Sequence, residues 1–327
     1  MRASPTSRVA AGRGGCTAAI QLRSRLLHLA PAAAAIAAVA LLSGGAGGPA
    51  AASSPVHGPT TGPPYGPGHV EILRLPSGDA DHTVRDVWVY RPPHADRPEV
   101  PVVYFLHGYP GNERNGDSVN LAGVLDRARA ATGRNFVVVV PDGNSAIHPD
   151  TEWADSVDGK VRLEQFVTSG LVRAVEGRHV RDRAHRAIAG FSMGGYGAMN
   201  LGLRHSDLYG QVAAVAGYFH PDDPDSMGGG QDGWARANSP DRLLANAHRT
   251  RLLLIDAAAE RDPLIKGEAR RFVRLARSDG LRPTLVVARG GHNWSMVAGQ
   301  VGRITGFFDA GWPRHHGPGG RRPEFLR

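Results

Sequence analysis

Residues 186–203 read Arg186-Ala187-Ile188-Ala189-Gly190-Phe191-Ser192-Met193-Gly194-Gly195-Tyr196-Gly197-Ala198-Met199-Asn200-Leu201-Gly202-Leu203. An apolar run, a serine between glycines and then small, helix-compatible residues predict a buried strand, a sharp turn and a helix. That is the context in which Gly-x-Ser-x-Gly forms a nucleophile elbow. The Ser192 hydroxyl would stand clear of the sheet, with glycines allowing close backbone approach. The pentapeptide alone also fits a glycine-rich turn without chemistry, so the neighbouring segments have to decide.

Short apolar runs alternate with helical stretches through most of the chain, which favours strands buried on both faces. The predicted strands are residues 70–75, 83–90, 102–106, 136–140, 186–189, 212–216, 252–255 and 284–288, and the predicted helices lie near 119–131, 162–177, 194–205, 265–279 and 295–309. The first two strands flank Gly78-Asp79 and are expected to form an antiparallel pair. The whole pattern predicts a mostly parallel, doubly wound α/β sheet with helices on both faces.

Polar side chains follow the predicted strands at the edge where such sheets bind ligands. The loop after the seventh strand contains Asp256, Glu260 and Asp262, and His292 follows the last strand. Serine, acid and histidine in this chain order are typical of α/β-hydrolases. We predict Ser192, Asp262 and His292 as the catalytic residues, with Glu260 as the alternative acid. Any of the three carboxylates could instead cap the helix that follows.

These residue types suit acyl chemistry. A serine hydroxyl becomes a good nucleophile when a nearby histidine takes its proton, and a carboxylate orients that histidine. The tetrahedral oxyanion needs two N–H donors, which we assign to the amides of Met193 and Tyr109. His107 is expected to be a structural turn residue. The sequence has no His-x-His or His-Glu-x-x-His motif, so no metal or other cofactor is expected.

The two ends of the chain differ in composition from the rest. Residues 1–52 contain five arginines and no acid. Within this segment the arginines precede an alanine-rich apolar run and then small residues, a pattern that predicts a secretory signal peptide cleaved before Ser53. An uncleaved membrane anchor is the alternative. Residues 53–68 are expected to be a Pro/Gly linker, residues 69–310 one catalytic domain, and residues 311–327 a disordered basic tail. Export would place the protein outside the cytoplasm, with membrane contact only through an uncleaved N-terminal segment.

The formal net charge of +8 is concentrated at these ends. Five arginines lie in the signal segment and a net charge of three more lies in the tail, so residues 69–310 are nearly neutral. This excludes an argument for nucleic-acid binding. Cys16, the single cysteine, precedes the predicted cleavage site, so the mature chain would contain no disulfide. The oligomeric state is not indicated.

Three segments resemble the esterase D family of α/β-hydrolases: residues 103–108, residues 187–199 with the nucleophile motif, and Gly290-Gly291-His292. The resemblance covers roughly residues 70–310. It implies the α/β-hydrolase fold and activities such as those of feruloyl and other carbohydrate esterases, S-formylglutathione hydrolases and secreted mycolyltransferases. Asp262-Pro263 matches the place of the acid in feruloyl-esterase-like members. Ala259 departs from the glycine that many relatives carry, and the cysteine-containing region typical of S-formylglutathione hydrolases is missing.

We therefore expect a secreted serine esterase acting on an acylated carbohydrate or a lipid ester in the cell envelope. Acyl transfer to a sugar hydroxyl is the alternative, and a non-catalytic binding protein on the same fold is a second one. The loop at residues 143–159 is predicted to face the substrate, with Trp153 and Asn144 as contacts. Trp153 could instead only pack the loop against the domain.

Overall fold

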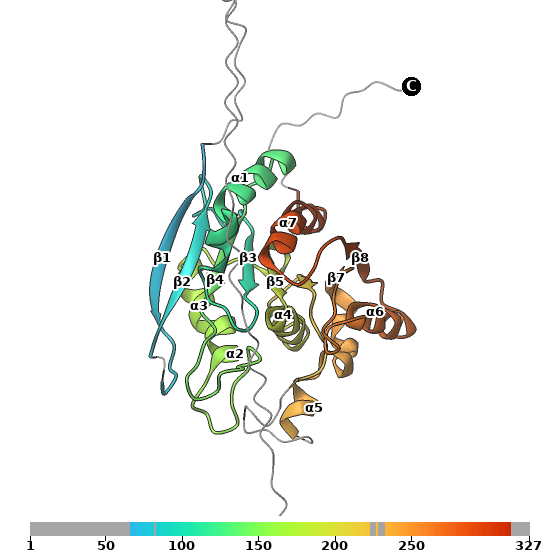
Figure 1. The fold of residues 1–327 in the computed structure, drawn as a ribbon. Helices are drawn as coiled ribbons and strands as arrows, with labels where there is room; N and C mark the ends of the chain where they lie inside the picture. Colours follow the sequence, from blue (N-terminus) through green and yellow to red (C-terminus); the bar gives the residue numbers. More distant parts are fainter. Residues whose placement is uncertain (1–65, 82, 223–226, 228–232, 315–327) are drawn as a thin grey trace, which may run out of the picture. The chain divides into compact units, whose positions relative to one another are not determined.

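Eight strands form one sheet in the computed structural model, which describes residues 66–314 except 82, 223–226 and 228–232 (Figure 1). The strands are β1 (His69–Pro76), β2 (Val84–Arg91), β3 (Val102–Leu106), β4 (Val137–Pro141), β5 (Arg186–Phe191), β6 (Gln211–Val215), β7 (Arg251–Ala257) and β8 (Thr284–Ala288). All eight strands that the sequence predicts are present, with bounds shifted by at most one residue except at the ends of β5 and β7, which lie two residues further along the chain.

The strand order is β1-β2-β4-β3-β5-β6-β7-β8. β1 and β2 are antiparallel, as the turn at Gly78-Asp79 predicts, and β2 pairs antiparallel with β4. Every later pairing, from β4 through β8, is parallel. The sheet is therefore mostly parallel, and its C-terminal edge carries the loops after β3, β4, β5, β7 and β8.

The helices cover both faces of this sheet (Figure 1). They are α1 (Leu121–Thr132), α2 (Leu163–Gln165), α3 (Leu171–Glu176), α4 (Met193–Arg204), α5 (Ala235–Ala237), α6 (Glu268–Ser278) and α7 (Trp294–Asp309). Buried side chains of α1 and α7 pack with Val103 and Phe105 of β3 on one face. Those of α3, α4 and α6 pack on the other face with Val102 and Tyr104. Alternate residues of one strand thus enter opposite cores, because successive side chains point to opposite faces.

Two helix predictions need correction. The helix predicted at 162–177 is divided by a π-helical turn, Phe166–Gly170, into α2 and α3. The helix predicted from 265 begins only at Glu268, because residues 262–266 form a turn in which the Asp262 carbonyl accepts from the amides of Ile265 and Lys266. The short α5 and the 3-10 turns Asn115–Val119, Arg183–His185, Pro240–Arg242 and Leu244–Arg249 were not predicted.

The predicted signal peptide at 1–52, most of the linker at 53–68 and most of the tail at 311–327 lie outside the described residues. Those predictions stay predictions. Within the part of the chain that the structure describes, no helix combines the length and the apolar character needed to cross a bilayer.

The crossing of β3, β5 and α4 permits no side chain at Gly194. A Cβ there would lie 2.0 Å from the Leu106 carbonyl oxygen, which is backbone and cannot rotate away.

We therefore expect Gly194→Ala to lower the unfolding free energy by about 3 kcal/mol or more. Gly302→Ala is the matched control, because a Cβ at this position of α7 meets nothing within 4 Å. It should stabilise the helix by about 0.5–1 kcal/mol. Thermal unfolding of both variants measures the difference. Equal melting temperatures would show that the backbone at Gly194 can move enough to accept a Cβ.

Candidate active site

Ser192 occupies a strained backbone conformation between β5 and α4. Its φ is 59° and its ψ is −123°, a region that residues other than glycine rarely adopt. Strain of this kind costs on the order of 1–3 kcal/mol and persists where the surroundings hold it. Here the Ser192 amide donates to the Val215 carbonyl at 2.9 Å, and the Ser192 carbonyl accepts from the Tyr196 amide at 3.1 Å. The predicted elbow is present.

Close backbone approach maintains this turn. A Cβ at Gly190 would lie 2.0 Å from the Gly194 carbonyl oxygen, so strand and helix touch directly across the serine. A Cβ at Gly108 would lie 2.8 Å from the Ser192 Cβ. The turn after β3 therefore lies beside the nucleophile motif, as required for the predicted oxyanion donor in that turn.

The two predicted oxyanion donors lie at the two sides of this contact. Met193 is the first residue of α4, so its amide has no acceptor within the helix, and the positive end of the helix dipole is at the same place. Tyr109 follows Gly108 in the turn after β3, and the residue is 48% exposed. Both amides thus belong to backbone next to Ser192.

His292 lies beside the elbow and is paired with Glu260. Its imidazole packs against the ring of Phe191, the residue before Ser192, with centroids 4.5 Å apart. Its Nδ1 lies 2.7 Å from Glu260 Oε2. The other carboxylate oxygen of Glu260 accepts from the amides of Arg261 and Asp262. Glu260 is buried and held in one orientation.

The geometry thus corrects the preference for Asp262. Its side chain is exposed, and its Oδ1 accepts from the Leu264 amide at 3.0 Å, which is the local turn that an Asp-Pro pair favours. Asp256 is not placed to orient His292 either, because it lies within β7 and forms an ion pair with Arg270. The amide of Ala259 donates to the Gly290 carbonyl, so the chain after β7 continues beside the chain after β8. Glu260, the next residue, falls opposite His292.

Electrostatics assign the protons of this pair. Burial alone would raise the pKa of the Glu260 carboxyl, but the amides of Asp262 and Arg261 and the neighbouring His292 outweigh burial and hold that pKa below its ordinary value. The carboxylate is therefore ionised at neutral pH. It accepts a hydrogen bond from His292, so Nδ1 of that ring carries the proton. Nε2 remains as the nitrogen that can take a proton, which is the state a general base needs.

His107 is buried and serves the structure, as predicted. Its Nε2 accepts from the Gly143 amide at 2.9 Å, so Nδ1 carries the proton and bonds to the Gly108 carbonyl at 3.0 Å. Both nitrogens are used within the fold, and His107 cannot act as the base.

Trp153 is packed inside the protein. Its side chain is completely buried, its Nε1 donates to the His107 carbonyl at 3.0 Å, and its ring packs edge-on against the His107 imidazole. Gly143 and Gly197 provide the space for the indole, since a Cβ at either would overlap it. This geometry is that of the packing alternative, and it leaves no exposed indole surface for the predicted substrate contact.

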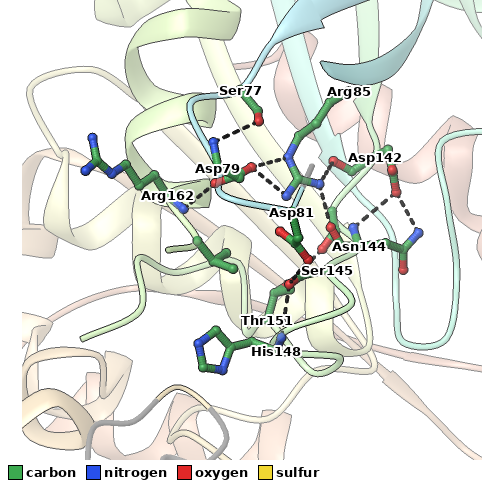
Figure 2. A network of polar contacts seen from close by, with 12 residues as sticks. Ser77, Asp79, Asp81, Arg85, Asp142, Asn144, Ser145, His148, Thr151 and Arg162 are labelled. Carbon is green, nitrogen blue, oxygen red and sulfur yellow. Dashed lines mark hydrogen bonds and ion pairs between the residues drawn. The ribbon is translucent and has the colours of Figure 1, made fainter. Parts of the chain in front are cut away.

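Asn144 is likewise turned toward the protein. Its Nδ2 donates to the Gly111 carbonyl at 2.7 Å and to Asp142 Oδ1 at 2.6 Å. Arg85 donates to the carbonyls of Asp142 and Asn144 and forms a fully buried ion pair with Asp79 (Figure 2). The amide of Asn144 thus belongs to a network that joins the β1–β2 turn to the loop after β4. This geometry does not favour a direct contact between the Asn144 side chain and a substrate.

Glu152 is a buried carboxyl that the sequence did not single out. It has a φ of 49°, its Oε2 accepts from the Tyr218 hydroxyl at 2.7 Å and its Oε1 accepts from the Asp222 amide at 2.8 Å. The Tyr218 ring stacks on Tyr196 of α4, with centroids 5.1 Å apart. Burial, and next the charge of Asp150, raise the pKa of Glu152 to about 8. No local pattern signals this role, because the partners are more than sixty residues away in sequence.

Within the described ranges, no group of three or more His, Cys, Asp or Glu side chains is arranged to hold a metal ion. The arrangement at the edge of the sheet is a strained serine, a histidine oriented by a carboxylate and two candidate amide donors. Such a set can form and break an acyl-serine bond.

The chain is similar to known esterases. Residues 82–266, more than half of the chain, match the model of the family named Putative esterase. The chain is 25% identical over 228 residues to the S-formylglutathione hydrolase of Paracoccus denitrificans (strain Pd 1222), covering 64% of this chain and 79% of that protein.

Solved structures share the fold. A ferulic acid esterase has a TM-score of 0.64 and 24% identity, covering 76% of this chain and 99% of its own. MPT51 (FbpC1) of Mycobacterium tuberculosis has a TM-score of 0.60 and 20% identity, covering 75% and 99%. The α/β-hydrolase fold predicted from the sequence is confirmed.

The raised pKa of Glu152 predicts a pH-dependent stability. Because the carboxyl has a pKa near 4.5 in the unfolded chain and about 8 in the fold, only the folded chain keeps the proton between these values. The corresponding stability is complete below about pH 4.5 and is lost as the pH rises through about 8, by at most ~1.4 kcal/mol per pH unit. Glu152→Gln should remove this loss and gain stability relative to the parent between pH 5 and 8. Urea unfolding at several pH values measures it, with the exposed Asp279→Asn as control. A constant difference across that range would contradict the prediction.

Proposed function

The chain belongs to this esterase family and is a carboxylic ester hydrolase of the α/β fold, and we propose that it works through an acyl-enzyme on Ser192, with His292 as base and Glu260 as the orienting acid. The observation that carries this proposal is the 2.7 Å contact between His292 Nδ1 and Glu260, beside a serine held at a φ of 59°. It replaces Asp262 by Glu260 in the predicted triad.

The first half of the reaction forms the acyl-serine bond. Ser192 Oγ attacks the ester carbonyl carbon while His292 Nε2 takes the hydroxyl proton, and Glu260 stabilises the resulting imidazolium. The carbonyl oxygen becomes an oxyanion next to the amides of Met193 and Tyr109. Collapse of this intermediate breaks the bond to the alcohol oxygen, and the alcohol leaves with the proton from His292.

The second half repeats these steps with water. His292 Nε2 takes a proton from the water that attacks the acyl carbon, and the acid product leaves as Ser192 recovers its proton. The strain at Ser192 supports this cycle because it keeps the hydroxyl at the head of α4, where the helix dipole and the Met193 amide favour negative charge.

The substrate class is proposed as an acylated carbohydrate or a lipid ester. The support is the resemblance to feruloyl and other carbohydrate esterases and the exposed ring of Tyr109 beside the site, which offers an apolar face to an acyl or sugar group. Acyl transfer to a sugar hydroxyl would use the same acyl-enzyme with another acceptor, so assays include trehalose beside water. We also extend the proposal to export, supported by the arginine-rich and apolar pattern of residues 1–52.

Removing the nucleophile tests the proposal. Ser192→Ala should lower the turnover of p-nitrophenyl esters by several orders of magnitude, since only oxyanion stabilisation and binding remain. Its melting temperature should not fall, because the hydroxyl is not needed for the turn. Steady-state assays over graded acyl lengths measure the effect. Retention of more than about a tenth of the activity would show that another residue is the nucleophile.

Variants of Glu260 and Asp262 distinguish the acid that the geometry favours from the acid that the sequence predicted. Glu260→Gln should cost roughly 10⁴-fold in turnover, because His292 loses the acceptor that fixes its tautomer. Asp262→Asn should cost far less, since this side chain only accepts from the Leu264 amide. Turnover numbers for both variants decide between them. If Asp262→Asn is the more damaged variant, the pairing of His292 with Glu260 does not operate during catalysis.

A further inference from the structure

The turn after β3 is held at both ends by side chains of the loop after β4. Trp153 Nε1 donates to the His107 carbonyl at 3.0 Å, and Asn144 Nδ2 donates to the Gly111 carbonyl at 2.7 Å. Tyr109, whose amide is the second oxyanion donor of the proposed function, lies between these two carbonyls. The position of that amide therefore depends on donors from outside its own turn.

The orientation of the Asn144 amide follows from its surroundings. Its two nearest partners, the Gly111 carbonyl and Asp142 Oδ1, are both acceptors, so the NH₂ group and not the oxygen must face them. Asp142 Oδ1 also accepts from the Asn144 backbone amide at 3.1 Å. These hydrogen bonds set the orientation of the Asn144 amide group, which donates both to its own loop and to the oxyanion turn.

A buried ion pair fixes the loop that carries Asn144. Arg85 and Asp79 have fully buried side chains 2.7 Å apart, and Arg85 Nη1 donates to the carbonyls of Asp142 and Asn144 at 3.1 and 2.7 Å (Figure 2). Asp79 also accepts from the Arg162 amide. A buried charge is tolerated only when it is paired and hydrogen-bonded in this way, so these groups have little freedom to shift.

We propose that Asn144 is a positioning residue for the oxyanion hole, holding the Gly111 end of the turn after β3 so that the Tyr109 amide meets the developing negative charge. The role rests on the proposed function, and it replaces the predicted substrate contact of Asn144. The Arg85–Asp79 pair, which belongs to the β1–β2 region, holds the backbone of Asn144 through the hydrogen bond from Arg85 to the Asn144 carbonyl. An oxyanion donor is worth about 10²–10³ in kcat, so a displaced one should cost a substantial part of that factor.

Asn144→Ala and Asn144→Ser test this role. Both should lower kcat about 10- to 100-fold with KM changed by less than about threefold, because ground-state binding does not use the oxyanion donors. Phenylboronic acid, which forms a tetrahedral adduct with an active-site serine, should bind each variant more weakly by nearly the same factor as kcat falls. A residue that only maintained the fold would not couple these two quantities.

Ser145→Ala is the matched control in the same loop. It removes hydroxyl contacts to Asp81, Ile147 and His148 but leaves the Asn144–Gly111 bond intact, so kcat and boronate affinity should stay within about twofold of the parent. Equal losses in Ser145→Ala and Asn144→Ala would overturn the positioning role, as would unchanged kcat and boronate affinity in both Asn144 variants. If the parent hydrolyses no ester, or does so without Ser192, the proposed function itself fails, which the Ser192→Ala assay shows separately.

Discussion

Direct backbone contact between β3, β5 and the first turn of α4 determines the geometry of the whole site. The contact is possible because Gly190 and Gly194 carry no Cβ, which would in each case lie 2.0 Å from a carbonyl oxygen. It leaves Ser192 no room for a relaxed conformation, so the serine adopts positive φ and its hydroxyl projects at the head of the helix. The same approach brings Gly108, and with it the second oxyanion turn, against the serine Cβ.

Around this contact the protein stabilises its functional loops with buried polar bonds rather than with apolar packing alone. His107 accepts at Nε2 from the Gly143 amide, Trp153 donates its indole N–H to the His107 carbonyl and Asn144 donates its amide N–H to the Gly111 carbonyl. Each of these bonds joins the turn after β3 to the loop after β4. Buried hydrogen bonds of this kind are costly to leave unmade, so the loops have one well-defined arrangement. A preorganised set of donors is what oxyanion stabilisation requires, since dipoles that must reorient during the reaction contribute less.

The sequence predicted the sheet, the elbow and the histidine because these depend on local patterns. Apolar runs, glycine spacing and chain order are readable without knowing the partners of each side chain. The acid could not be resolved in the same way, since Glu260 and Asp262 are two residues apart. The carboxylate that faces His292 is set by the folding of this loop, in which the Ala259 amide donates to the Gly290 carbonyl. Trp153 and Asn144 were read as substrate contacts for a similar reason: polarity and loop position indicate the correct edge of the sheet but not the direction of a side chain.

Covalent labelling with a fluorophosphonate, followed by mass spectrometry of the intact protein and of its peptides, tests the central claim most directly. The reagent reacts with a serine that is activated by a neighbouring base. We predict one adduct per folded chain, located on Ser192, and none after thermal denaturation. An adduct on a different serine, or ester hydrolysis that continues after complete labelling of Ser192, would contradict the assignment of this elbow as the catalytic centre.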